Sequence, residues 1–138
     1  MRSNDTMLKL RRFEVNEKQQ KVNEIESMMA DFQRVIDDLS HQIEVEEETS
    51  RIRDVNHFSY PPYAKAARKR RDNLRSSIES LEAKAADARA ELNEALEELR
   101  KGEMLDERST IEHDRSAHKP HGRDTLAVSA SHLFNSRA

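Results

Sequence analysis

The chain has 138 residues, of which 37% are charged and 35% are apolar, and its formal net charge is -3. A globular domain of this length needs a broader apolar share and more turn residues, so this composition favours long helices over a compact α/β domain. The slightly negative net charge gives no general attraction to nucleic acid. There is no cysteine for disulfides or thiolate metal sites; with no apolar signal core and no stretch of ~20 apolar residues, a cytoplasmic location is expected.

The first predicted helix covers residues 4–53. From residue 8 to residue 50 the apolar residues recur at alternating steps of three and four, which is the spacing of a heptad seam. Residues 3–6 supply polar side chains that can cap the helix, and no glycine or proline interrupts it before Asp54. All six a positions of the seam are apolar: Leu8, Val15, Val22, Met29, Ile36 and Ile43.

A turn is predicted over residues 54–62, with the sequence DVNHFSYPP. Two consecutive prolines do not fit a helix interior, but they suit the first turn of a following helix. Three aromatic residues, Phe58, Tyr60 and Tyr63, stand close together here. They either plug the end of a helical core or form an aromatic tip that docks on a partner, and the sequence leaves both interpretations open.

The second predicted helix covers residues 62–112, and its seam runs from residue 67 to residue 109. Gly102 is its weak point, because glycine is a poor helix former. The tail, residues 113–138, is rich in Ser, His and Arg and is predicted to be mostly disordered. The spacing of its histidines places no fixed pair on an ordered helix, so no metal site is expected at His113, His118, His121 or His132.

The two seams fit each other when the second is folded back on the first. Pairing residues whose numbers sum to 117 sets Phe32 against Ala85, so that a bulky side chain meets a small one. The same register sets Glu46 against Arg71, Arg11 against Asp106, and Gly102 against Val15. The predicted fold is therefore all-α: a long antiparallel two-helix coiled-coil hairpin over residues 1–112 with a disordered C-terminal tail, in which Phe32 is the largest buried side chain of the middle.

A basic stretch covers residues 65–75, with the sequence KAARKRRDNLR. In isolation this composition suggests a nucleic-acid patch. The predicted register places it beside the acidic residues 44–49 of the first helix, which would largely neutralise it. No aromatic residue is interleaved for base stacking, so nucleic-acid binding is not the favoured interpretation.

No catalytic constellation is visible in the sequence. It contains no glycine-rich phosphate loop, no nucleophile–histidine–acid arrangement on a core, and no HExxH zinc motif. We therefore expect a non-enzyme without cofactor, metal or small-molecule substrate. Leu10, Phe13 and Met104 lie off the seam at the open end, near Leu105, and the expected register sets Phe13 and Met104 at the same height. They are either a docking site or ordinary scattered surface residues.

Three stretches resemble the flagellar export protein FliJ family, most of all its alphaproteobacterial members. They are KLRRFEVNEKQQKVNEIESMMADFQR in the first helix, YAKAARKRRDNLR after the turn, and ELRKGEMLDERS near the end of the second helix. Together with the charged hairpin pattern, the resemblance covers roughly residues 1–112. It provides no sharp motif that assigns single residues to single partners.

The resemblance implies a soluble component of the flagellar type III export apparatus. FliJ proteins are similar to the coiled-coil stalk of rotary ATPases, insert into the hexameric export ATPase, and contact the membrane export gate. They are also linked to export chaperones. The chain would then lie at the cytoplasmic face of the inner membrane. Two alternatives remain open: a generic cytoplasmic coiled-coil scaffold or adaptor, and a nucleic-acid-binding helical hairpin.

Overall fold

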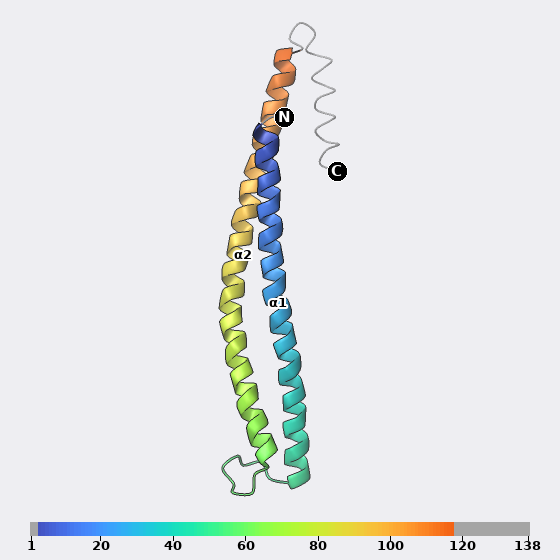
Figure 1. Ribbon diagram of the computed structural model, residues 1–138, viewed down its shortest axis with the longest axis vertical. Helices are drawn as coiled ribbons and strands as arrows, with labels where there is room; N and C mark the ends of the chain where they lie inside the picture. Colours follow the sequence, from blue (N-terminus) through green and yellow to red (C-terminus); the bar gives the residue numbers. More distant parts are fainter. Residues whose placement is uncertain (1–2, 118–138) are drawn as a thin grey trace. The chain divides into compact units, whose positions relative to one another are not determined.

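The computed structural model describes residues 3–117. Two helices, α1 (Ser3–Ser50) and α2 (Pro62–Ala117), account for all of its regular structure, and residues 51–61 join them. The two helices lie side by side and run antiparallel, so the predicted all-α helical hairpin is confirmed (Figure 1). Of the predicted tail, residues 118–138 lie outside the described part of the chain.

The helix boundaries differ from the expected ones at three of the four ends. α1 begins at Ser3 and stops at Ser50, because Arg51 adopts a left-handed backbone conformation with φ of 61°, which is how many helices end. α2 begins at Pro62 as predicted, and the carbonyl of Pro61 accepts its first helical bond from the Lys65 amide at 3.1 Å. It continues beyond residue 112 to Ala117, so His113 is helical, since no glycine or proline stands between Gly102 and Pro120.

The chain divides into two packing units. The loop-end unit comprises residues 18–92, and the open-end unit combines residues 3–17 with residues 93–117 of the described chain. In the loop-end unit Leu39, Ile43 and Ala67 form a buried cluster, against which Val35 and Leu74 pack. Further buried apolar side chains of this unit lie at the predicted seam positions: Val22, Ile36, Leu81, Ala85, Ala88 and Leu92. In the open-end unit the buried apolar side chains include Leu8 and Ala95.

The register that we predicted between the helices is wrong by about one heptad. A Cβ atom built on Gly102 would lie 3.2 Å from Leu8 Cδ2, whereas Val15 was the expected neighbour. Arg71 Nη1 donates to Ser40 Oγ at 3.2 Å instead of meeting Glu46. Arg11 shows the same shift: its Nη2 lies 3.9 Å from Glu98 Oε2, whereas Asp106 was the expected partner.

Heptad periodicity explains why the sequence did not decide this register. A shift by seven residues returns every a and d position to the seam, so the same side chains remain inside. Two charge pairs seemed to favour the expected register, but long side chains on a half-exposed seam can reach other partners. The register that forms leaves Arg71 Nε and Asp106 Oδ1 buried without a hydrogen-bond partner within the described residues.

The burial of Phe32 also differs from the prediction. It is half-buried, not the largest buried side chain of the hairpin, and no large side chain is fully buried in the described part of the chain. Ala85, its expected neighbour, is completely buried. Two helices enclose a seam residue from one direction only, so a ring as large as phenyl keeps one edge in water. Truncation of Phe32 should therefore cost less than the ~3–5 kcal/mol of an enclosed phenylalanine.

Replacing Gly102 by alanine should stabilise the hairpin. Gly102 has no positive φ, so alanine fits its backbone, and alanine favours the helix by about 1 kcal/mol over glycine. The new methyl group meets only the end of the Leu8 side chain, which has to move by a few tenths of an ångström. We expect thermal unfolding to show a gain of about 0.5–1 kcal/mol. The same change in a Leu8→Ala background is the control and should give the full gain. A lower melting temperature for Gly102→Ala would mean that Leu8 is held rigidly.

Candidate functional site

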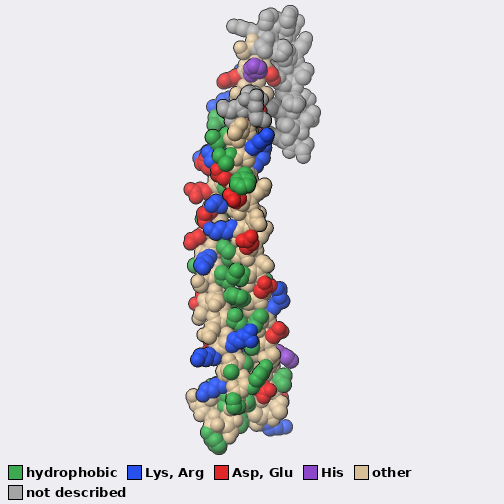
Figure 2. Space-filling view, viewed as in Figure 1, with side chains coloured by type: hydrophobic (Ala, Val, Ile, Leu, Met, Phe, Trp, Pro, Cys, Tyr) green, Lys and Arg blue, Asp and Glu red, His purple; other side chains and the backbone are tan. Residues whose placement is uncertain are grey.

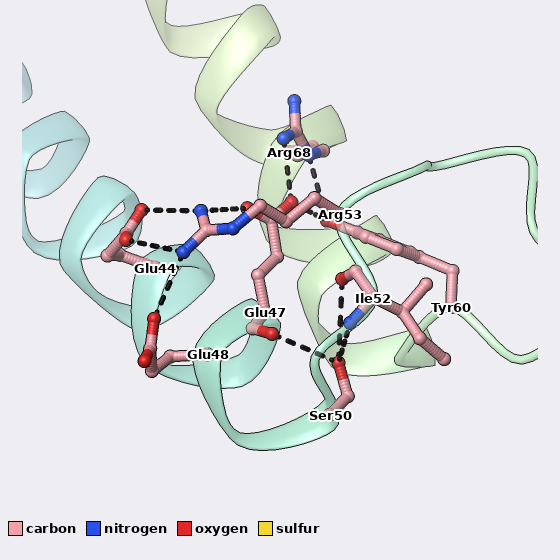
Figure 3. Close-up of polar contacts among 8 residues, drawn as sticks. All are labelled: Glu44, Glu47, Glu48, Ser50, Ile52, Arg53, Tyr60 and Arg68. Atoms are coloured by element: carbon pink, nitrogen blue, oxygen red, sulfur yellow. Dashed lines mark hydrogen bonds and ion pairs between the residues drawn. The ribbon is translucent and has the colours of Figure 1, made fainter.

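A buried polar cluster closes the hairpin where α1 meets the loop. Glu47 is only 4% exposed, and its Oε2 atom accepts two hydrogen bonds, from Tyr60 Oη at 2.6 Å and from Arg68 Nη2 at 2.8 Å. Arg68 Nε also donates to Tyr60 Oη at 2.9 Å, which completes a triangle of α1, loop and α2 (Figure 3). The three side chains therefore tie three separate segments together at one point.

Arg53 closes the same cluster from the loop side. Its Nη1 lies 3.6 Å from Glu47 Oε1, the oxygen that Tyr60 and Arg68 leave unused. Its Nη2 donates to Glu44 Oε1 at 3.1 Å and to Glu48 Oε2 at 3.0 Å. Both oxygens of the buried carboxylate thus face a guanidinium group, and Arg53 draws the first loop residues back along α1 (Figure 3).

Ser50 caps the end of α1 within the same cluster. Its hydroxyl donates to the Glu47 carbonyl at 3.4 Å and accepts a hydrogen bond from the Ile52 amide at 3.2 Å. Further along, the His57 amide donates to the Asp54 carbonyl at 3.1 Å, and the Tyr60 amide donates to the His57 carbonyl at 3.0 Å. These turns give the loop a fixed path, which carries Tyr60 back to Glu47.

The electrostatics of the cluster favour an ionised Glu47. The hydrogen bonds from Tyr60 and Arg68 lower the pKa of the Glu47 carboxyl below its usual 4.5, against the opposing effect of burial. Burial raises the pKa of the Tyr60 phenol, and its hydrogen bond to the carboxylate acts in the same direction. At neutral pH the cluster therefore contains a carboxylate, a neutral phenol and guanidinium groups.

The three loop aromatics differ in burial, so they do not form one unit. Tyr60 is 5% exposed and plugs the end of the core. Phe58 is 94% exposed and stacks on His57, with ring centroids 4.8 Å apart. Tyr63 is 58% exposed, and its hydroxyl donates to Gln42 Oε1 at 3.1 Å. Sequence reasoning treated Tyr60 as an apolar plug and missed its hydroxyl, although an aromatic residue with a polar end fits beside an acidic helix end.

The basic stretch is neutralised less than we predicted. Among the ion pairs of residues 4–116, Arg68 is the one member of the stretch that reaches residues 44–49. Arg53 occupies Glu44 and Glu48, and Arg75 pairs with Asp72 on its own helix. Lys65, Lys69 and Arg70 are exposed. The unexpected competitor was a loop arginine, whose position no heptad pattern predicts.

The open end carries the exposed apolar patch that the sequence indicated. We define the open-end patch as five side chains that are between 47% and 61% exposed: Met7, Leu10, Phe13, Met104 and Leu105. The expectation that Phe13 and Met104 share one height is wrong. Because Gly102 lies beside Leu8, Met104 is level with residues 6 and 7, and Phe13 lies about 10 Å further along α1. Met7 was not singled out from the sequence, and it lies at about the height of Met104.

Charged side chains of both signs surround the exposed apolar positions. Figure 2 shows lysine, arginine and carboxylate side chains interspersed with apolar ones over the face in view. Beside the open-end patch, Arg12 lies 4.0 Å from Glu103, and Arg100 pairs with Glu97 at 2.6 Å. Within residues 3–117 no group of three potential metal ligands comes together. Neither α1 nor α2 contains an apolar window of the kind that spans a bilayer.

Comparison with known proteins provides no relative: no family model, no curated protein and no solved structure matches this chain. The candidate surfaces are therefore defined by the geometry of the chain itself. They are the open-end patch and the exposed aromatic residues of the loop, the latter positioned by the Glu47 cluster.

The Glu47 cluster should make the hairpin sensitive to acid in a specific way. Because the pKa of Glu47 is lowered in the folded state, the stability from its ionised form is fully present above about pH 4.5 and is lost as the pH falls through the lowered value. At pH 7, Glu47→Gln should cost about 1–3 kcal/mol, measured by chemical denaturation. The difference between the wild-type chain and this variant should shrink below about pH 4.5.

The matched control is Glu44→Gln, which removes an exposed carboxylate that pairs with the same Arg53. Its cost should not exceed about 1 kcal/mol, since exposed ion pairs contribute little. Equal losses for the two variants, or a difference for Glu47→Gln that persists at low pH, would contradict the assigned role of the buried carboxylate.

Proposed function

We propose that the protein is a non-enzymatic component of a bacterial flagellar type III export apparatus, in which the hairpin is a stalk-like partner of the hexameric export ATPase and of the export gate. The resemblance of three stretches to the FliJ family motivates this assignment. The observation that carries it is the open-end patch, where both helices present large apolar side chains to solvent. A location at the cytoplasmic face of the inner membrane and a link to export chaperones belong to the same proposal.

The open-end patch has the chemistry of a protein-docking surface. Exposed apolar clusters rimmed by charge are typical of protein interfaces, and phenylalanine and methionine suit their desolvated centres. Ion pairs beside the patch join the two helices, from Arg12 to Glu103 and from Arg11 to Glu98. They hold the patch in place before a partner arrives, which lowers the ordering cost of binding.

A purification experiment tests the proposal directly. The tagged full-length chain is expressed together with the export ATPase of the same bacterium, and co-purification of the hexamer is the expected result. Association with other proteins but not with the ATPase would favour the generic scaffold instead.

The exposed basic side chains of Lys65, Lys69 and Arg70 support a nucleic-acid-binding hairpin as the weaker alternative. Binding of this kind depends steeply on salt, because each neutralised phosphate releases a counterion. A titration with duplex DNA and with RNA at two salt concentrations distinguishes the alternatives. Salt-sensitive binding that is lost in a Lys69→Glu, Arg70→Glu variant would favour nucleic acid over the ATPase.

The open-end patch should be needed for ATPase binding but not for folding. The double variant Phe13→Asp, Met104→Asp places two charges in the patch, so we expect ATPase affinity to fall by about tenfold to a hundredfold. Far-UV circular dichroism should be unchanged, because both side chains are more than half exposed, at 58% and 51%. Phe58→Asp, at a still more exposed aromatic of the loop, is the control and should bind normally. The opposite pattern, normal binding by the double variant and loss with Phe58→Asp, would move the ATPase site to the loop.

A further inference from the structure

A groove runs between α1 and α2 on one side of the loop-end unit. It has a volume of about 340 Å³, and Val35, Leu39 and Ala67 form its apolar floor. Leu39 and Ala67 belong to the buried core cluster and Val35 packs against that cluster, so the groove continues the core toward the surface. Its rims are polar: Asp38 stands on α1, and Tyr63 and Arg70 stand on α2.

Apolar side chains extend this groove along α1. Met28 and Val35 are separated by one heptad and lie on the same face of the helix. Met28 is 46% exposed, and Val45, near the other end of the groove, is 47% exposed. The same flank of α2 carries both large and small residues, namely Tyr63, Ala66, Arg70, Asn73, Ser77 and Ser80, so another helix can approach most closely at Ala66, Ser77 and Ser80. α1 thus has a mixed stripe beside its seam, in which Asp31, Asp38 and Gln42 alternate with Met28, Val35 and Val45, and the hairpin itself leaves this stripe partly exposed.

The charges on the two rims indicate what covers the stripe. Asp38 and Arg70 are both exposed, and among residues 4–116 no ion pair within 4.0 Å joins them. They are nearly level with each other, since the adjacent Arg71 donates to Ser40. One rim is therefore acidic and the other basic at the same height. A surface of this kind is complementary to itself when it is turned by 180° about an axis parallel to the helices.

We propose that this groove pairs two copies of the chain face to face as a four-helix dimer, with a two-fold axis parallel to the helices. In this arrangement α1 of each copy lies over α2 of the other. The symmetry sets Asp38 of each copy against Arg70 of the other, so one self-complementary surface provides two ion pairs. Met28, Val35 and Val45 then lie against α2 of the other copy, where Ala66, Ser77 and Ser80 leave room for them.

The extent of the surface predicts a weak dimer. At the far end of the stripe the same symmetry brings Glu24 toward Asp87, and these like charges limit the contact to about residues 28–45 and 63–80. A footprint of about 30 by 20 Å on two helices is near the lower limit of specific interfaces. We therefore expect a dissociation constant in the micromolar range, with monomers in dilute solution.

Reversal of one charge at a time tests the pairing. Asp38→Arg makes both rims basic and Arg70→Asp makes both acidic, so each variant alone should be monomeric, with a dissociation constant raised at least tenfold. An equimolar mixture of the two variants restores opposite charges across both contacts, and it should dimerise like the wild-type chain. Sedimentation equilibrium over a range of concentrations measures all three samples of the full chain.

Matched controls separate this effect from net charge. Asp37→Arg and Lys69→Asp make the same charge changes one residue away, at exposed positions outside the groove, and should dimerise normally. Ala66→Glu places a carboxylate in the groove four residues before Arg70, where it can pair with that guanidinium, so this variant should also be monomeric with unchanged circular dichroism. A monomeric wild-type chain at millimolar concentration would overturn the proposal. So would a mixture that stays monomeric, which would leave the groove to a helix of another protein.

Discussion

The buried carboxylate of Glu47 is the constraint on which the rest of the hairpin depends. A carboxylate that is 4% exposed is costly unless opposite charges and hydrogen-bond donors surround it. Its donors and partners come from the loop, through Tyr60 and Arg53, and from the first turns of α2, through Arg68. The loop has to return along one path to supply them. That path fixes where α2 starts beside α1, and with it the register of the two helices.

The apolar contacts of the seam hold the two helices together, but they do not select one register. Its buried members are mostly alanine, valine, leucine and isoleucine at heptad spacing, and they repeat closely enough that a shift by one heptad conserves the apolar contacts. Two buried polar atoms, Arg71 Nε and Asp106 Oδ1, lack hydrogen bonds in the register that forms. The polar contacts of Glu47 lie at one end of the hairpin and join α1, the loop and α2 there.

A two-helix hairpin also explains why so much apolar surface stays outside. With only two elements, each helix has one covered face, and large residues on the seam, such as Phe32, remain half-buried. Any further apolar side chain, in the open-end patch or along the groove, has no place inside. Such a molecule stabilises itself with a narrow seam and has its remaining apolar residues available for partners. This property agrees with a role in assembly, whichever partner binds.

The sequence by itself determined the two helices, the seam positions and the exposure of Leu10, Phe13 and Met104. Heptad spacing is a local property, and two prolines and a glycine-poor chain leave little choice of topology. It did not determine the register, the end of α1 at Ser50, the half-burial of Phe32 or the partners of the basic stretch. The register and the partners of the basic stretch depend on where a loop of irregular residues places Arg53 and the start of α2, which no periodicity encodes. The end of α1 follows from the left-handed Arg51, and Phe32 stays half-buried because two helices enclose a seam ring from one side only. Only the tertiary structure brought Glu47, Tyr60 and Arg68 together, because the cost of burying a charge depends on contacts between segments distant in the sequence.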